Sequence, residues 1–136
     1  MQLFTYGSLM FPEIWQRVAC VTSRGDYRSA PATAQGYARY ALIDDTYPGM
    51  IASPQATVEG VLYFDVDAQD VAALDAFEGN EYRRDLINVV INSGEIVIAC
   101  TYIFIARQRL STLPWEPQAF QMSRFIGSYC RDKLGG

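Results

Sequence analysis

The chain has 136 residues, half of them hydrophobic, which is enough for one domain (1–136) with a substantial core. Its net charge of −4, with basic residues that are scattered except for Arg83-Arg84, excludes a surface built to bind nucleic acid. The lack of histidine excludes Ser-His-Asp and Cys-His catalysis and most zinc and non-haem iron sites. Because the only lysine, Lys133, lies near the C-terminus, a carboxylate is the leading candidate for proton transfer.

Apolar runs and cysteines narrow the class of protein further. The longest apolar run, over residues 96–106, is interrupted by Thr101 and is far shorter than the roughly 20 residues needed to cross a bilayer. The N-terminus has neither a basic region nor a signal-peptide segment, so we expect no membrane span and a cytoplasmic protein. Cys20, Cys100 and Cys130 are far apart and odd in number, as is typical of buried thiols rather than of a disulfide framework or a metal site.

The N-terminal stretch predicts a strand, a tight turn and a helix. Residues 2–6 alternate polar and apolar side chains, as a strand does, and residues 12–20 read as a helix. Gly7 and Ser8 therefore lie where main-chain N–H groups are exposed and a ligand can approach closely, which suits a carboxylate or a polarised carbonyl. The alternative is a plain turn, with Pro12 at the first helical position.

The middle of the chain is dominated by strand patterns. Residues 21–31 are polar and predict a surface loop, and residues 32–44 predict a strand that contains Gly36. The Tyr47-Pro48-Gly49 sequence predicts a turn that ends this ladder, before a short strand over 50–53. Residues 57–66 predict a stronger strand, in which Gly60 marks a bulge or close packing.

The second half predicts a helix, a hairpin and a closing helix. Asp67 is a candidate N-cap for a helix over 68–78, and Gly79-Asn80 ends it. Two long strands, 82–92 and 95–106, are joined by the two-residue turn Ser93-Gly94. Residues 108–114 read as a connection and 117–133 as a closing helix.

These elements predict an α+β fold with about six or seven strands and three helices. A small mixed β-barrel flanked by helices is the preferred architecture, because many strands in a small domain must protect their edges. An open α+β sheet is the alternative.

One carboxylate is placed where a helix should bury its apolar side. Successive helical residues advance by about 100 degrees, so Val71, Leu74 and Glu78 share one stripe, with Asp75 at its margin. Burial disfavours the ionised form of a carboxylate and raises its pKa toward the range of a general base at neutral pH. The alternative is that Glu78 turns into solvent or pairs with Arg83 or Arg84.

Four sequence motifs occur together in a characteristic order. They are Tyr6-Gly7-Ser8-Leu9, Tyr47-Pro48-Gly49, the stretch 58–63 (Val-Glu-Gly-Val-Leu-Tyr), and the stretch 74–79 (Leu-Asp-Ala-Phe-Glu-Gly) followed by Tyr82-Arg83-Arg84. In this order they resemble the γ-glutamylcyclotransferase-like superfamily, especially its avirulence-induced-gene-like and γ-glutamylamine cyclotransferase branch. The resemblance extends over essentially the whole domain.

The resemblance implies a small barrel with a cavity where the loop meets the glutamate, and an enzyme that needs no metal or cofactor. Tyr6, Gly7, Ser8 and Leu9 would hold a γ-glutamyl group, and Glu78 would be the catalytic acid/base. The implied reaction closes 5-oxoproline by attack of the α-amine on the side-chain carbonyl. Tyr63 and Tyr102 are candidates to line the pocket, although a packed aromatic role is the alternative for each.

One departure from the family's pattern leaves the substrate open. Leu9 stands where the branch that acts on free γ-glutamyl amino acids often has asparagine, so the leaving group is an amino acid, a cysteinyl peptide, a polyamine or a protein-linked amine. The competing functions are a non-catalytic module that binds a small carboxylate and a protein-interaction domain. The sequence does not set the oligomeric state.

Overall fold

The computed structural model describes residues 1–19, 27–43 and 45–117. All but the first residue of the predicted closing helix, 117–133, lies outside this part of the chain, as do Cys20 and Cys130.

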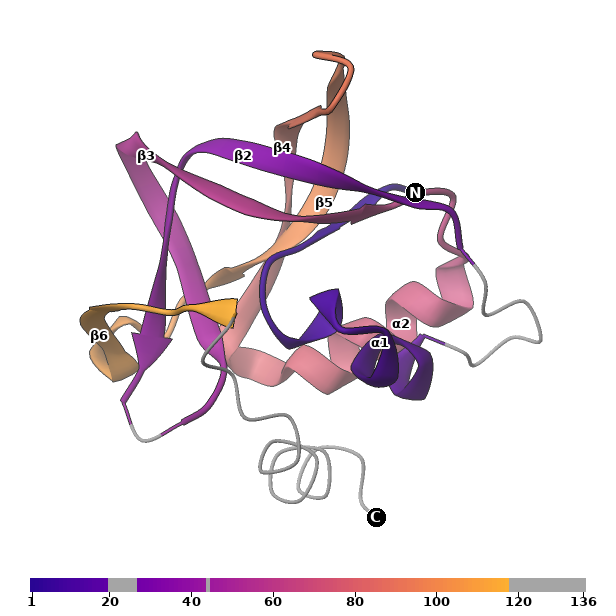
Figure 1. Ribbon diagram of the computed structural model, residues 1–136. Coiled ribbons are helices and arrows are strands. Elements are labelled where there is room, and N and C mark those ends of the chain that lie inside the picture. Colours follow the sequence, from indigo (N-terminus) through magenta and orange to yellow (C-terminus); the bar gives the residue numbers. More distant parts are fainter. Residues whose placement is uncertain (20–26, 44, 118–136) are drawn as a thin grey trace.

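Five strands close into a small mixed barrel (Figure 1). The strands follow the order β3-β1-β5-β4-β2, and a further pairing between β2 and β3 closes the ring. β1 runs antiparallel to β3 and parallel to β5. The predicted mixed barrel is thereby confirmed, and the open sheet is wrong, because β2 and β3 pair along most of their length. The bounds are β1 Leu3–Thr5, β2 Ser29–Leu42, β3 Pro48–Tyr63, β4 Tyr82–Ile91 and β5 Ile96–Phe104.

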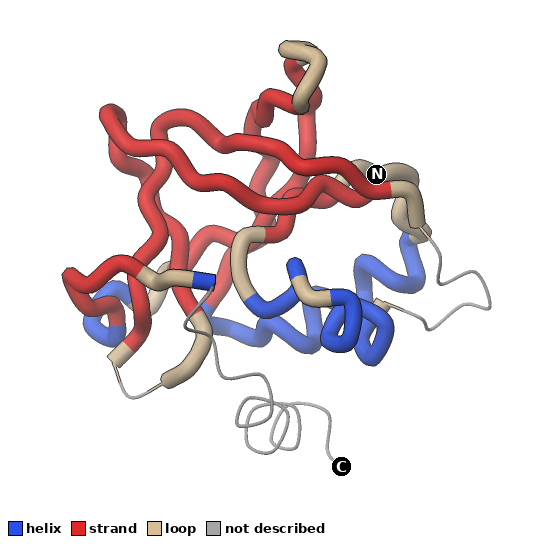
Figure 2. Tube along the Cα trace, in the orientation of Figure 1, coloured by secondary structure: helices blue, strands red, loops and turns tan. Residues whose placement is uncertain are grey.

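The two described α-helices, α1 (Pro12–Val18) and α2 (Ala68–Glu78), gather on one side of the barrel (Figure 2). Three short 3₁₀ turns, η1 (Ser8–Met10), η2 (Gly79–Glu81) and η3 (Arg107–Arg109), join helices and strands. No helix in the described residues is long and apolar enough to cross a membrane.

The β2–β3 hairpin differs from its sequence-based prediction. Rather than ending the ladder, Pro48 and Gly49 pair with Ala41 and Tyr40, so β3 is one strand instead of two. The register shifts where Gly36, at φ +86°, stands opposite residues 53–56. The irregularity contains Pro54, which has no N–H to donate to a ladder. Because a bulge leaves residues unpaired, the two strands can pair again beyond the proline.

Residues 108–114, predicted as a connection, form part of η3 and a sixth strand. This strand, β6 (Leu110–Pro114), pairs with the end of β2 outside the closed ring. Arg109 beside it forms ion pairs with Glu81 and Asp45, which hold the segment against the turn after α2. These partners are distant in sequence, so local patterns did not indicate them.

Two hydrophobic clusters stabilise the domain. One fills the barrel, around Phe4, Met50 and Val89, and the other lies between the barrel and the helices, around Trp15 and Phe77. A buried carboxylate belongs to the helix side of the structure. Asp70, in the first turn of α2, is fully buried and accepts a hydrogen bond from the Tyr27 hydroxyl.

Gly60 gives a direct test of barrel packing. A Cβ at this position would lie 2.1 Å from the Thr5 main-chain oxygen, which belongs to a neighbouring strand and has little freedom to move. We expect Gly60→Ala to lower the free energy of unfolding by at least about 2 kcal/mol, measured by urea denaturation. Gly94→Ala is the control, since it meets open space and carries only the cost of a positive φ, about 1 kcal/mol. Equal losses in the two variants would contradict this account of the packing.

Tyr63 links burial to alkaline stability. Its ring stacks on Trp15 with centroids 3.7 Å apart, and burial raises the pKa of its hydroxyl to about 12. The unfolded chain therefore releases this proton first, and the stabilising contribution is lost as pH rises from about 10 to 12. When pH is raised from about 9 to about 11, we expect the free energy of unfolding to fall by about 1 kcal/mol less in Tyr63→Phe than in the wild type. Urea titrations at the two pH values measure this difference. An identical pH dependence in both proteins would refute this assignment.

Candidate active site

The loop after β1 is held by its own carbonyl groups and by a neighbouring proline. The amides of Met10 and Phe11 donate to the carbonyls of Gly7 and Ser8, at 3.0 and 3.1 Å. A Cβ at Gly7 would lie 2.9 Å from the ring of Pro48, so this position has no room for a side chain unless the loop or the proline shifts. The local sequence thus forms a tight turn with its main chain close to β3.

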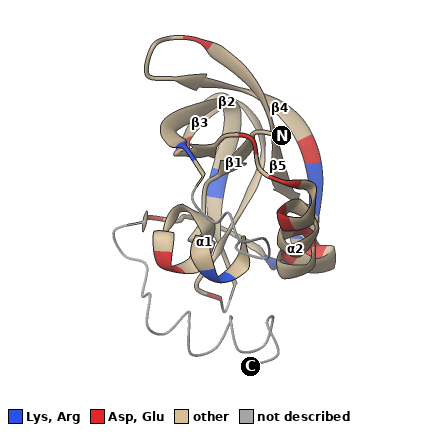
Figure 3. Cartoon of the chain, turned by 90° about the vertical axis from the view of Figure 1, so that its right-hand side faces the viewer, with Lys and Arg blue, Asp and Glu red and all other residues tan. Residues whose placement is uncertain are grey.

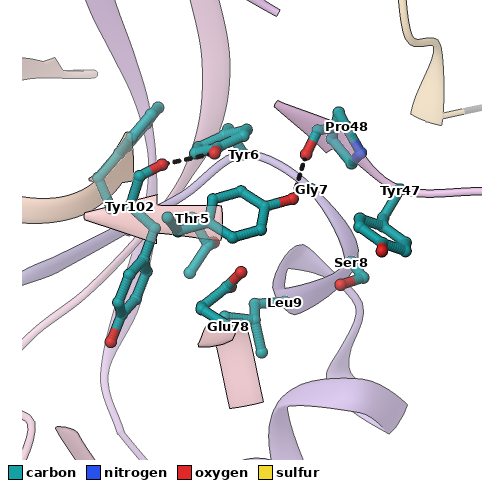
Figure 4. A pocket seen from close by; sticks show the side chains of 11 residues that line it. Thr5, Tyr6, Gly7, Ser8, Leu9, Tyr47, Pro48, Glu78 and Tyr102 are labelled. Carbon is teal, nitrogen blue, oxygen red and sulfur yellow. Dashed lines mark hydrogen bonds between the residues drawn. The ribbon is translucent and has the colours of Figure 1, made fainter. Parts of the chain in front are cut away.

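Glu78 reaches the same region from the end of α2. Val71 and Leu74 are buried on the stripe that helical spacing predicted, and Glu78 is partly buried at its end. Gly79, at φ 77°, ends the helix immediately after it. Figure 4 shows the Glu78 carboxylate pointing toward the loop.

A narrow cavity lies between the loop and Glu78, with about 350 Å³ of unfilled space that includes solvent at its mouth. The structure brings together six of the seven residues singled out from the sequence: Glu78, Tyr6, Gly7, Ser8, Leu9 and Tyr102. The further lining residues are Phe4, Thr5, Tyr47, Pro48 and Tyr82.

Tyr63, the seventh residue, is not among those that line the cavity. Its ring is in the core, stacked on Trp15, and its hydroxyl lies 3.5 Å from the Leu9 carbonyl. The sequence placed it on a strand next to the site, but could not set which neighbour its ring would contact. Tyr63 therefore acts on the site only by supporting the loop from behind.

Three tyrosine hydroxyls of the cavity wall donate to protein acceptors. The Tyr6 hydroxyl donates to the Tyr102 carbonyl at 2.5 Å, and the Tyr82 hydroxyl donates to the Pro48 carbonyl at 2.7 Å (Figure 4). The Tyr102 hydroxyl donates to Oδ1 of Asp75 at 2.7 Å. A phenol has a single proton, and each of these hydroxyls donates it to a protein acceptor. To a ligand, each hydroxyl can therefore only be a hydrogen-bond acceptor.

Burial keeps the phenols of Tyr6, Tyr47 and Tyr102 protonated, because it raises the pKa of each. Burial, and then the nearby Glu78 charge, raise the pKa of Tyr6 well above its usual value. Burial raises the pKa of Tyr47 to about 12, and burial with the Asp75 hydrogen bond raises that of Tyr102. None of the three is a base near neutral pH. Among the described lining residues, Glu78 is the only carboxylate.

The arginines proposed as alternative partners of Glu78 form ion pairs with other residues. Arg83 pairs with Asp85, Nη2 to Oδ2 at 2.9 Å, and Arg84 pairs with Asp75, Nε to Oδ1 at 3.0 Å. Basic and acidic residues are neighbours at the start of β4, as Figure 3 shows. The alternative in which an arginine draws Glu78 away from the cavity thus loses support.

Sequence reasoning treated Tyr47, Pro48 and Tyr82 as parts of motifs but not as site residues. The signal was present, since Tyr47-Pro48 and Tyr82 lie within the motifs that carry the family resemblance. They line the cavity because β3 and β4 lie beside the loop, a packing that the sequence did not predict. In the described chain, no group of three or more His, Cys, Asp and Glu side chains is arranged to hold a metal ion.

Comparison with known sequences adds independent information. A family model described as "Gamma-glutamyl cyclotransferase, AIG2-like" matches residues 3–119. Protein AIG2 C of Arabidopsis thaliana is 32% identical over 104 residues, covering 76% of this chain and 61% of the relative. AIG2-like protein A of the same plant is 30% identical with the same coverage. The chain thus spans about three-fifths of the length of these curated relatives.

Solved structures share the fold over almost the whole chain. A solution structure of an Arabidopsis thaliana protein superposes with a TM-score of 0.71 at 26% identity, covering 98% of this chain and 81% of that one. A structure described as a γ-glutamyl cyclotransferase superposes with a TM-score of 0.63 at 15% identity, covering 98% and 79%. At that identity the second match is evidence for the fold alone. From the extent of the family match, the chain belongs to the γ-glutamyl cyclotransferase, AIG2-like family.

Proposed function

We propose that this protein is a γ-glutamylcyclotransferase that converts a γ-glutamyl group into 5-oxoproline and releases an amine or amino acid. The observation that supports it is the shared cavity, lined both by Glu78 and by the loop residues Gly7, Ser8 and Leu9. These two features come from elements seventy residues apart, and the fold places them around one space.

The chemistry needs one group that accepts and returns a proton. The α-ammonium of the substrate must lose a proton before its nitrogen can attack the side-chain carbonyl. Glu78 accepts this proton and donates it to the nitrogen of the leaving amine, and then relays in the same way the second proton that the attacking nitrogen loses as it becomes the lactam N–H. The C–N bond to the amine breaks as the ring C–N bond forms, and the amine leaves with both protons. The proton count balances, and no further reactant is consumed.

The loop and the aromatic wall supply positioning. Main-chain N–H groups near Gly7 to Leu9 are suited to hold the α-carboxylate or the oxyanion that develops at the attacked carbonyl. A narrow cavity also favours the folded conformer in which amine and carbonyl approach each other, which contributes to the rate through orientation. The tyrosine hydroxyls, held by protein acceptors, keep this shape fixed.

The first test removes the acid/base and keeps the shape of its side chain. We expect Glu78→Gln to lower the release of 5-oxoproline by about 10²- to 10⁴-fold, the usual contribution of a positioned acid/base. Release is measured by chromatography with a panel of γ-glutamyl amino acids, peptides and amines as substrates. The matched control is Glu13→Gln, an exposed glutamate on α1, which should retain wild-type rates.

The panel also separates the proposal from a pure binding module. If a γ-glutamyl ligand raises the melting temperature of the wild type but no 5-oxoproline is released, the protein is a binding module and the proposal is refuted. If release occurs and Glu78→Gln retains it in full, the cavity is catalytic but the assigned acid/base is wrong.

A further inference from the structure

Arg39 of β2 places a guanidinium directly behind the loop. Its Nη1 donates to the Tyr6 carbonyl at 2.7 Å and to the Glu59 carbonyl at 3.1 Å. The same guanidinium lies 5.2 Å from the centroid of the Trp115 ring. One side chain thus ties the last residue before Gly7 to β3 and to the segment after β6.

Arg39 belongs to no wall of the cavity. It is absent from the described residues that line the space between the loop and Glu78. It contacts the loop through the main chain of Tyr6, whose ring is itself part of the wall. Any effect of Arg39 on a bound molecule must therefore pass through the Tyr6–Gly7 peptide.

The geometry of that peptide sets the direction of the effect. The described chain has no cis peptide bond, and in a trans peptide the carbonyl oxygen and the following N–H point in opposite directions. With the Tyr6 oxygen turned toward Arg39, the Gly7 N–H is turned away from Arg39. The next two carbonyls, of Gly7 and Ser8, accept hydrogen bonds from Met10 and Phe11. Arg39 is thus the side chain that completes a run of three held carbonyls.

The charge of Arg39 adds to this orientation. A cationic donor on a carbonyl oxygen draws electron density from the peptide and strengthens the N–H on its other side as a donor. Burial lowers the pKa of Arg39, with Glu116 and Glu59 opposing that shift. Even with its pKa lowered by burial, an arginine guanidinium remains charged at neutral pH.

We propose that Arg39 is a positioning residue for the γ-glutamyl site. By holding the Tyr6 carbonyl, it directs and strengthens the Gly7 N–H for the carboxylate or oxyanion of a γ-glutamyl substrate, without touching that substrate. This role rests on the proposed function for its effect on rate. Its effect on the loop does not depend on turnover.

The kinetic test compares three variants. We expect Arg39→Met to lower kcat/KM by about tenfold or more, as loss of an aligned main-chain donor does. Arg39→Lys, which keeps a cationic donor but loses the planar guanidinium, should recover part of the activity, with a kcat/KM between those of Arg39→Met and the wild type. Arg28→Met is the matched control, because Arg28 also lies over an aromatic ring, Phe64 at 4.2 Å, and should leave kcat/KM unchanged. An Arg39→Met protein within threefold of the wild type would overturn the proposal.

A second measurement tests the orientation of the Gly7 N–H and needs no substrate. Residual dipolar couplings of the Gly7 amide, measured on the unliganded protein by nuclear magnetic resonance, report the direction of the N–H bond. We expect a changed Gly7 coupling in Arg39→Met, an unchanged one in Arg28→Met, and unchanged couplings along β1 in both. A wild-type Gly7 coupling in Arg39→Met would refute the positioning role, whether or not any substrate is turned over.

Two further outcomes distinguish the proposed function from the positioning role of Arg39. If the wild type releases no 5-oxoproline but the Gly7 coupling moves as expected, the proposed function fails and the positioning of the loop stands. If Arg39→Met does not fold, Arg39→Gln replaces it, with the same expected loss of kcat/KM and the same change in the Gly7 coupling.

Discussion

The close approach of β1 and β3 at Gly60 is the constraint on which the site depends. The Thr5 carbonyl lies so near Gly60 that no side chain fits between the strands. β1 has only three residues, yet it pairs with a strand on each side. Two threonine hydroxyls add to this hold, since Thr5 donates to the Val61 carbonyl and Thr101 donates to the Phe4 carbonyl. A short strand fixed in this way sets where the loop leaves the barrel.

A chain of contacts then joins the loop to the segment that carries Glu78. Gly7 packs against the ring of Pro48, and the Pro48 carbonyl accepts the hydroxyl of Tyr82. Tyr82 begins β4 only four residues after Glu78, with η2 between them. The loop and the carboxylate are thus positioned by one continuous set of contacts rather than by two separate parts of the fold.

Local patterns predicted the parts of this site but not its assembly. Helical spacing identified Glu78, and the change from a strand pattern to a helix pattern identified the turn at Gly7 and Ser8, because both signals are local in the sequence. The continuity of β3 was missed because Tyr47-Pro48-Gly49 indicates a turn and residues 50–53 and 57–66 were predicted as separate strands, whereas pairing with β2 begins at Pro48 and resumes after a register shift. The buried Asp70 and the place of Tyr63 depend on partners such as Tyr27 and Trp15, which no local period reveals.

The charges around Tyr6 show how the cavity can hold a carboxylate and still suit an anionic group. Glu78 raises the pKa of the Tyr6 hydroxyl and Arg39 lowers it, so charges of opposite sign act on one residue of the wall. The negative charge is in the cavity, and the positive charge is behind the loop, linked to it through the Tyr6 carbonyl. Because opposite charges partly cancel at short range, a guanidinium at this position offsets the repulsion between Glu78 and an entering carboxylate. A lone carboxylate in the same cavity would favour cations, and under the proposed function the guanidinium behind the loop would lessen that preference for the α-carboxylate of the substrate.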